Sequence, residues 1–367
     1  MNRKFALLWV VTLALVLAAC GSSDSPNDNT GGDSDDSDGS VVTDVPQFSS
    51  AETMKAAHPA IKGTLGTVTN LASSELTATV MSVPFAGESV YAPMVLQSQS
   101  AEDEPLPRWV MEWQPENGEF EVSEHSDDTL IVRWPYEFRD VTKDAELEIA
   151  YTRTEFHKGY EWPTNVDYQF TTGGTDFGRG GVTLTRFTQL GTCDNDDFYL
   201  PTHLNIDGYL GNSRDRLEID ASAEAKQSGA ELLLISNGNL AIESGGESTG
   251  LKWDVELSSL WEQEPGGSYC YEALVPQTGK INITLESNDT SLEFALSGAV
   301  RYDEDDFVTG VTFGGHVDLN GTRAFEVTGT IDGSPNVQFT FADNEKRTLP
   351  QVLNGLKAEF PELNDTF

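Results

Sequence analysis

The sequence has few basic residues. Its 367 residues include 22 Lys and Arg against 60 Asp and Glu, which gives a formal net charge of −38. A surface that binds nucleic acid needs cations to neutralise phosphates, so we expect no nucleic-acid partner. The same balance disfavours electrostatic docking on anionic lipid. Dense carboxylates either serve the function directly or adapt the surface to a saline habitat, and the sequence leaves both readings open.

Signatures of catalysis are also missing. The five histidines form no His-x-x-x-His or His-Glu-x-x-His pattern, and no Gly-x-Ser-x-Gly elbow is present. We therefore assign no catalytic residue and expect a protein that is not an enzyme. With sixty acidic residues, many carboxylate pairs could hydrolyse a glycoside, so a surface enzyme acting on polysaccharide is kept as the third reading.

Long hydrophobic runs are absent beyond the first twenty residues. Arg3 and Lys4 precede a short apolar run that ends in Leu17-Ala18-Ala19-Cys20. Such a run is too short to span a membrane as a helix and is typical of a signal peptide. Its ending resembles the lipobox of bacterial lipoprotein precursors. The resemblance implies that residues 1–20 are a signal peptide, cleaved before Cys20, and that Cys20 is lipidated.

The lipobox resemblance also implies a location in the cell. More than one acyl chain on Cys20 would give stable anchoring, which a single chain does not. Position 21 is Gly rather than the Asp that retains such proteins at the inner membrane. We therefore expect a membrane partner through the lipid anchor, in the cell envelope, and at the outer membrane if the host has one.

Residues 21–44 form the next segment. They contain seven Asp and no basic residue. Such a composition cannot bury enough apolar surface to fold, and its charges repel one another. We predict an acidic disordered tether between the anchor and the body of the protein.

The rest of the chain is dominated by a two-residue period. Leu217, Ile219, Ala221 and Ala223, for example, alternate with acidic or small polar residues. This pattern puts one face of a strand in a core and the other in water. Turn dipeptides such as Asn320-Gly321 separate the runs and indicate hairpins. Residues 279–343 are predicted to form a five-stranded antiparallel meander.

The first half is strand-like but less regular. Its strand candidates are 64–70, 75–83, 90–97, 108–114, 118–123, 128–134, 145–154, 165–171 and 181–188. Short helices are predicted at 51–57, stopped by Pro59, and at 352–359. A polar break at 191–197 suggests a β-rich domain at 45–190 and a β-meander domain at 191–367. The predicted class is all-β, with antiparallel sandwich- or barrel-like sheets.

Five residues are site candidates. Asp194, Asp196 and Asp197 offer hard oxygen ligands of the kind that calcium prefers, so calcium is the only cofactor considered. Trp109 and Trp113 share one strand face; core packing is the favoured interpretation, and a platform for sugar or peptide is the alternative. The run 173–181, with five glycines, predicts an irregular loop.

Three cysteines are few for an exported chain. Lipidation of Cys20 would leave Cys193 and Cys270 as the only thiols. Two cysteines in an exported protein are typically paired, so we predict a disulfide between them. Two buried thiols are the alternative.

The body of the chain resembles uncharacterised lipoproteins of Deinococcus-type bacteria. The resemblance lies in residues 108–120, 128–136 and 200–208, which are rich in strand-forming and turn residues. It implies a β-rich lipoprotein and assigns no activity.

Together these observations predict a lipid-anchored envelope protein with a non-catalytic binding or structural role, in contact with another envelope protein. The second reading is a carrier or chaperone for an apolar ligand or lipid. In that reading the meander curls into a half-barrel with its apolar face inward. The two readings differ in whether that face is covered by another sheet or left open.

Overall fold

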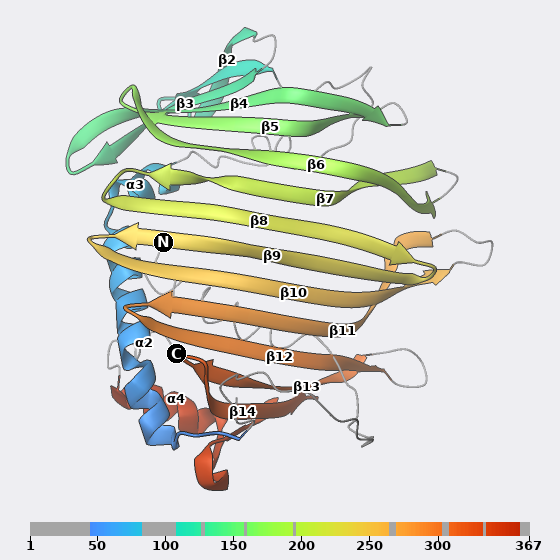
Figure 1. Ribbon diagram of the computed structural model, residues 1–367. Helices are drawn as coiled ribbons and strands as arrows, with labels where there is room; N and C mark the ends of the chain where they lie inside the picture. The colour runs from blue at the N-terminus through green and yellow to red at the C-terminus, as the bar shows by residue number, and fades with distance from the viewer. Residues whose placement is uncertain are drawn as a thin grey trace, which may run out of the picture.

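The computed structural model describes residues 45–82, 108–125, 129–157, 160–193, 196–263, 269–302, 308–332 and 335–359. Sixteen strands form one sheet, in the order β16-β15-β14-β13-β12-β11-β10-β9-β8-β7-β6-β5-β4-β3-β1-β2 (Figure 1). Three α-helices accompany it within these ranges. The all-β class predicted from the alternation is confirmed.

The strands are long in the middle of the sheet and short at both edges. Their bounds are β1 Trp109–Gln114, β2 Glu119–His125, β3 Thr129–Phe138, β4 Val141–His157, β5 Tyr160–Thr172, β6 Thr175–Cys193, β7 Asp196–Gly211, β8 Asp215–Ser228, β9 Glu231–Ser244, β10 Glu247–Gln263, β11 Tyr269–Ser287, β12 Thr290–Tyr302, β13 Val308–Leu319, β14 Thr322–Ile331, β15 Pro335–Thr340 and β16 Lys346–Thr348.

The sheet is a meander from β3 to β16, because each strand pairs antiparallel with the next. At the other edge, β1 pairs antiparallel with β2 and parallel with β3. The five-stranded meander predicted at 279–343 is confirmed as β11 to β15, and it is one part of a longer one. The boundary predicted near residue 190 falls inside β6, which pairs with β7, so it does not divide the sheet. The polar break at 191–197 is the tip of that hairpin.

Tight turns lie at one end of the sheet. Arg139–Asp140, Gly173–Gly174, Gly245–Gly246, Asn288–Asp289 and Asn320–Gly321 each have two successive residues with positive φ. This is the backbone of two-residue hairpin turns whose twist matches that of the strands. These turns fix the register of the strands that they join.

Helix α2 (Ser50–Ala72) crosses this end of the sheet and contacts β9 to β13 (Figure 1). Ser49 caps it: its hydroxyl accepts a hydrogen bond from the Glu52 amide, and Glu52 accepts one from the Ser49 amide. The buried side chains of α2 are small, namely Thr53, Ala57, Ala60, Gly63 and Thr67. The helix can therefore lie close to the hairpin turns, and the Thr249 hydroxyl donates to that of Thr67 over 3.2 Å.

The N-terminal helices correct several sequence predictions. Pro59 does not end the first helix but lies inside α2, and the strand predicted at 64–70 is helical. The strand predicted at 75–83 is helix α3 (Glu75–Met81). Local β-branched residues favoured strands here, but the caps and the packing against the sheet outweigh that propensity. The strand predicted at 90–97 lies outside the described residues. The helix predicted at 352–359 is confirmed as α4 (Leu349–Glu359).

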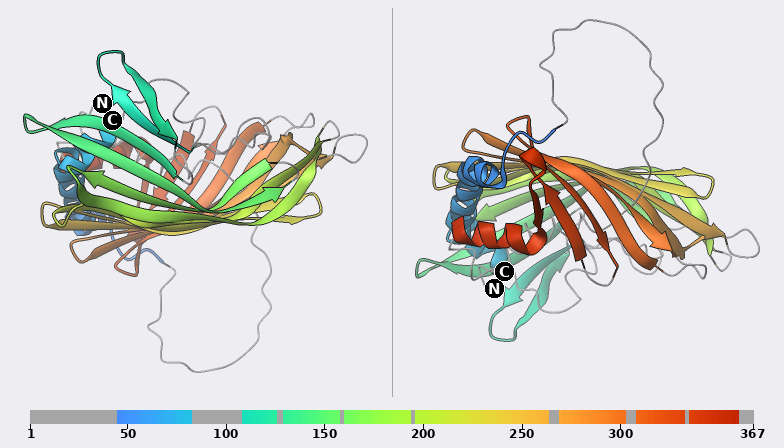
Figure 2. Two further views of the ribbon diagram at one scale, coloured as in Figure 1. Left: turned by 90° about the horizontal axis from the view of Figure 1, so that it is seen from above. Right: turned by 90° about the horizontal axis from the view of Figure 1, so that it is seen from below.

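The sheet is curved and open. Both of its edges bend toward the side on which the helices lie, so that side is concave (Figure 2). We call it the concave face and the opposite one the convex face. Within the described ranges no second sheet packs on the first, so the sandwich form of the prediction is wrong. The strands instead form an open half-barrel.

Glu345 fastens the start of α2 to the C-terminal part of the chain. Its carboxylate accepts hydrogen bonds from the Ser50 amide over 3.0 Å and the Ser50 hydroxyl over 2.7 Å. Arg347 Nε donates to the same group over 2.8 Å. These bonds, with the Ser50 amide first, lower the pKa of Glu345 from its ordinary 4.5 to about 2.

Glu345→Gln should therefore destabilise the protein at neutral pH and less so in acid. The ionised carboxylate stabilises the fold above its ordinary pKa of 4.5, and this contribution is lost as the pH falls through about 2. Urea unfolding at pH 7, 5 and 3 measures it, with Glu116→Gln in the exposed β1–β2 turn as the control. A difference between the two variants that stays constant over this range would contradict the assignment.

Candidate functional site

The concave face is built from the apolar positions of the alternating strands. Register places Ile219, Leu240, Leu251, Leu285 and Leu292 next to one another across β8 to β12. The intervening residues, many of them Asp, Glu or Lys, point to the convex face. No concave-face position is charged in the central parts of five neighbouring strands. These parts are residues 217–225 of β8, 234–242 of β9, 251–257 of β10, 281–285 of β11 and 292–300 of β12.

Two hydrophobic clusters bury the flanks of this face. Under α3, Leu76 packs on a cluster in β3 to β6 that includes Trp134 and Phe170, whose ring centroids lie 5.6 Å apart. Under α2, Ala57 and Ala60 pack on a cluster in β12 to β14. The helices therefore supply a second layer at one end of the sheet, where α2 contacts β9 to β13 and α3 contacts β3, β7 and β8.

Between the two clusters lies a region that the helices bury only in part; Leu285 and Phe294 at its margin still pack on the cluster under α2. We call it the apolar band: a set of concave-face residues of β8 to β12 that are neither fully buried nor polar. Its members are Ile219, Ala221, Ala223, Leu240, Leu251, Trp253, Val255, Ile283, Leu285, Phe294 and Leu296. Each of these is half-buried, whereas Ile281, which pairs with Val255 and Leu296 inside the band, and Leu292 at its edge are buried, 3% and 6% exposed. A contiguous, partly exposed apolar surface of this kind is typical of a binding site.

Glycines opposite large side chains keep the concave face smooth. A Cβ on Gly238 would lie 2.4 Å from the Trp253 ring, and one on Gly329 would lie 2.5 Å from the Phe313 ring. Tyr168 lies in the same way against Gly180 and Gly208. Each large side chain therefore occupies the space that a side chain at the facing glycine would need.

Trp253 stands at the centre of the apolar band. It lies on the middle strand, β10, between Leu251 and Val255. Its indole Nε1 donates to the Ser236 hydroxyl over 3.1 Å. The one polar atom of the ring is thus satisfied within the sheet, as buried Trp usually requires. What the ring offers to a ligand is its apolar surface.

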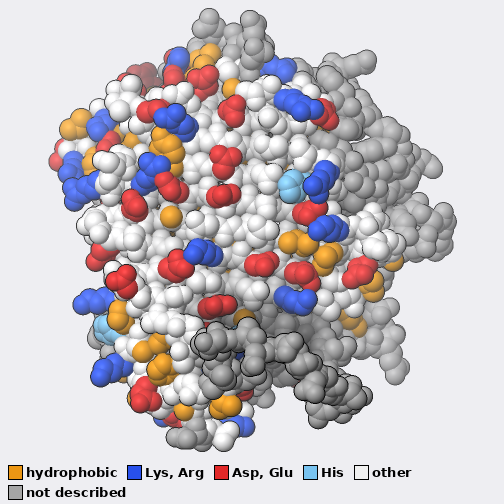
Figure 3. All heavy atoms as spheres, in the orientation of Figure 1, with side chains coloured by type: hydrophobic (Ala, Val, Ile, Leu, Met, Phe, Trp, Pro, Cys, Tyr) orange, Lys and Arg blue, Asp and Glu red, His pale blue; other side chains and the backbone are white. Residues whose placement is uncertain are grey.

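The convex face has the opposite character. Acidic and basic side chains are scattered over it (Figure 3), and they form ion pairs across strands. Lys252 Nζ lies 2.7 Å from Glu286, and Lys280 Nζ lies 3.1 Å from Glu256. These pairs are exposed, so each contributes little to stability, but together they keep this face hydrated.

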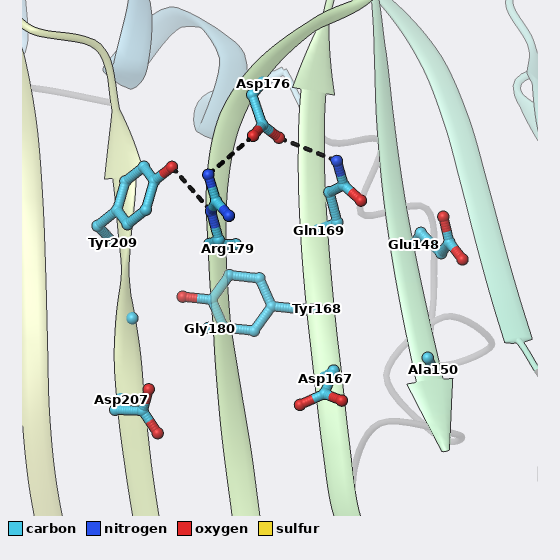
Figure 4. Close-up of a pocket in the computed structure, with 11 residues that line it drawn as sticks. Glu148, Ala150, Asp167, Tyr168, Gln169, Asp176, Arg179, Gly180, Asp207 and Tyr209 are labelled. Carbon is cyan, nitrogen blue, oxygen red and sulfur yellow. Dashed lines mark hydrogen bonds and ion pairs between the residues drawn. The ribbon is translucent and has the colours of Figure 1, made fainter. Parts of the chain in front are cut away.

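The convex face also contains a shallow polar pocket of about 470 Å³ over β4 to β7 (Figure 4). Arg179 is its main feature: Nε donates to the Tyr209 hydroxyl over 3.2 Å, and Nη2 pairs with Asp176 over 3.2 Å. Gln169 donates to Asp176 over 2.9 Å. Burial, followed by the charge of Asp207, raises the pKa of Tyr168 below the pocket. Arg179, Asp176, Gln169 and Tyr209 thus bind one another, while the carboxylates of Glu148, Asp167 and Asp207 also line the pocket without a dashed contact to them (Figure 4).

The run 173–181 is not the irregular loop that its glycines predicted. It forms the β5–β6 turn at Gly173–Gly174 and the first half of β6. Gly178 and Gly180 lie in the strand because Leu210 and Tyr168 occupy the space that their side chains would need. Packing inside the sheet accounts for these two glycines.

The predicted aromatic pair lies away from the apolar band. Trp109, Met111 and Trp113 share one face of β1, as expected. Trp113 is half-buried and packs edge-on against Phe120, with ring centroids 5.2 Å apart, at the margin of the cluster under α3. The structure thus brings Trp113 into core packing. A role of either residue in binding stays a prediction.

The remaining predicted sites fall largely outside the described residues. These are Cys20, Asp194 and the side chains of Asp196, Asp197, Cys193 and Cys270. Over the ranges that are described, no three His, Cys, Asp or Glu side chains are grouped to hold a metal ion. The calcium site and the disulfide stay predictions.

Comparisons with protein-family models, curated protein sequences and solved structures find no match. Of the helices that the structure describes, none is both long and apolar enough to cross a membrane.

The fit of Trp253 over Gly238 predicts a non-additive pair of mutations. Gly238→Ala should destabilise by about 1–3 kcal/mol, because its methyl group would overlap the ring. Trp253→Ala should destabilise by about 2 kcal/mol or more through lost packing. The double variant should be more stable than the sum of the two losses, since the clash disappears with the ring. Urea unfolding of all four proteins tests this, and strict additivity would show that the two residues do not touch.

The strand arrangement gives the disulfide prediction a test. Cys193 ends β6, Cys270 is the second residue of β11, and β11 contacts β6 although four strands separate them in the sheet. We expect the intact mass of the exported protein to be two hydrogens below that of the reduced chain, and Cys193→Ser to abolish the difference. In the chain-entropy model, closing this loop would stabilise by roughly 4 kcal/mol. An unchanged mass on reduction would mean two free thiols.

Proposed function

We propose that this protein is a lipid-anchored envelope protein that carries an apolar ligand on the apolar band. One observation supports this above the others. On the part of β8 to β12 that forms the band, the concave face presents an uncharged and mostly half-buried apolar surface, and among the described residues no second sheet covers it. Of the two readings of the sequence, an open apolar face favours the carrier.

The energetics of the band support a ligand of hydrocarbon character. Covering an apolar side chain fully stabilises by roughly 1.5–3 kcal/mol, and the band side chains have part of that burial still to gain. With no charge on the band, nothing there would recognise an ionic group. An apolar ligand would complete the burial that the helices leave unfinished.

The proposed anchor fits this role. Lipidation at Cys20 and an acidic tether at 21–44 would hold the protein beside a membrane while leaving it free to turn toward the lipid surface. The charged convex face would keep its other side in water. A carrier of this kind takes an apolar molecule from one apolar environment and shields it until it reaches the next. This chemistry needs no catalytic residue.

Native mass spectrometry of the full-length chain, released from non-ionic detergent, tests the proposal. We expect a stoichiometric non-covalent apolar adduct that organic extraction removes. Ile283→Glu places a charge in the band and should lose the adduct, because a carboxylate in an apolar contact is strongly unfavourable. Asn282→Glu is the matched control, since it adds the same charge one residue away on the exposed convex face.

Two results would overturn the proposal. One is a chain that carries no adduct after purification and takes up none from lipid vesicles. The other is equal loss or equal retention of the adduct in Ile283→Glu and Asn282→Glu, provided that circular dichroism shows both variants folded. Either result would place the function on the charged convex face or elsewhere.

A further inference from the structure

The convex face carries a row of short polar side chains beside its pocket. Register aligns one such residue from each of β5 to β10, two positions along the strands from the pocket carboxylates of Asp167 and Asp207. With strands about 4.8 Å apart, the row is about 24 Å long. We call it the polar row, and its members are Asn165, Thr183, Asn205, Ser222, Asn237 and Asp254.

The composition of the polar row opposes strand formation. Asn and Asp are depleted in strands, because their side chains compete for the hydrogen bonds of the backbone. Every member of the row is exposed or half-buried, so packing in a core does not offset this cost. Residues that break a local rule without a gain in packing are expected at functional surfaces.

Much of the hydrogen-bonding capacity of the polar row is turned to solvent. The Ser222 hydroxyl donates to Asn237 Oδ1 over 2.9 Å, and Asn205 Nδ2 lies 3.2 Å from His203 Nε2. Within the described part of the chain, the side chains of Asn165, Thr183 and Asp254 form no hydrogen bond. Amide and hydroxyl groups both donate and accept, so the row presents both kinds of partner to a ligand.

The pocket over β4 to β7 adjoins this row and adds charged groups. The carboxylates of Glu148, Asp167 and Asp207 line it outside the hydrogen bonds of Arg179 (Figure 4). The Arg179 side chain is itself 66% exposed, so its guanidinium is accessible as a donor. Hydrogen bonds to ionised groups are roughly twice as strong as neutral ones. The pocket therefore supplies strong partners for hydroxyl groups at one end of a long neutral row.

Gly181 lies between two of these carboxylates, and packing does not require a glycine there. A Cβ at this position would lie 3.4 Å from Asp167 Oδ1 and 3.7 Å from Asp207 Oδ1, which are ordinary contact distances. Its backbone does not adopt a positive φ. Gly180 differs, because Tyr168 occupies the space that its side chain would need. A glycine that weakens a strand without such a reason marks a place where a ligand approaches closely.

The chemistry of this surface selects the class of ligand. The polar row lacks the aromatic and aliphatic anchors on which protein interfaces depend. The nearby carboxylates repel anions, whereas sugar hydroxyls both donate and accept hydrogen bonds. We infer that the convex face binds a linear neutral polysaccharide, with one sugar residue in the pocket beside Asp167 and Asp207 and the next ones over the polar row. This site is separate from the apolar band and does not depend on the proposed function.

Affinity electrophoresis tests the inference on the full-length chain in a polyoxyethylene detergent, which contains no sugar. The native gels contain hydroxyethyl cellulose, galactomannan or mixed-linkage β-glucan, and a further gel contains alginate as an anionic polymer. We expect at least one neutral polymer to retard the protein and alginate to leave its migration unchanged.

Two variants with matched controls locate the site. Gly181→Val places bulk between two pocket carboxylates and should weaken binding by roughly tenfold or more, although valine favours a strand. Gly314→Val is its control, because a Cβ on this β13 glycine would meet no atom closer than 3.8 Å. Asn237→Val should weaken binding about fivefold through lost hydrogen bonds. Thr328→Val, exposed on the same face of β14, should not.

Three results would overturn the inference. The first is a wild-type protein that none of the three neutral polymers retards. The second is equal retardation of wild type and Gly181→Val, or an equal loss in Gly181→Val and Gly314→Val. The third is stronger binding to alginate than to every neutral polymer. The apolar adduct of the proposed function is measured separately, so its presence or absence leaves each of these results unchanged.

Discussion

One constraint governs this molecule: a single layer of sheet has two faces, and only one of them can meet water at no cost. A strand in which apolar and polar residues alternate directs its apolar side chains to one side. The sheet built from such strands therefore has one apolar face. Most domains cover such a face with a second layer. Here the second layer within the described residues is helices α2 and α3 at one end, and the curvature of the sheet shields part of the face instead.

Much of the fold follows from local sequence. The alternation around Leu217 and the turn at Asn320–Gly321 each act over a few residues, so strands and hairpins could be predicted. The helices could not, because α2 contains Pro59 and many β-branched residues, and it is held by the Ser49 cap and by strands far along the chain. A sandwich and a single open sheet share the same alternation, so the pattern alone could not distinguish them.

The candidate site was less accessible to sequence reasoning than the fold. The alternation placed Trp253 on an apolar face, but it gave no reason to prefer that Trp over Trp109 or Trp113. The distinguishing signal was Gly238, which lies directly opposite Trp253 once the register is counted from the Gly245–Gly246 turn. Glycine in a strand marks a close approach or a bend. Which face is left open depends on where the helices pack, and that contact joins residues too far apart for a local pattern to reveal.

Helix α2 also sets the order in which the chain can reach its final form. It is the first described element, yet its contacts are with β9 to β13, which begin at Glu231 and end at Leu319. During synthesis from the N-terminus, this helix therefore cannot dock until most of the meander has formed. Contacts at such sequence separation slow folding and lengthen the exposure of apolar surface. The last step of folding should therefore be the docking of the first described helix onto the finished strands.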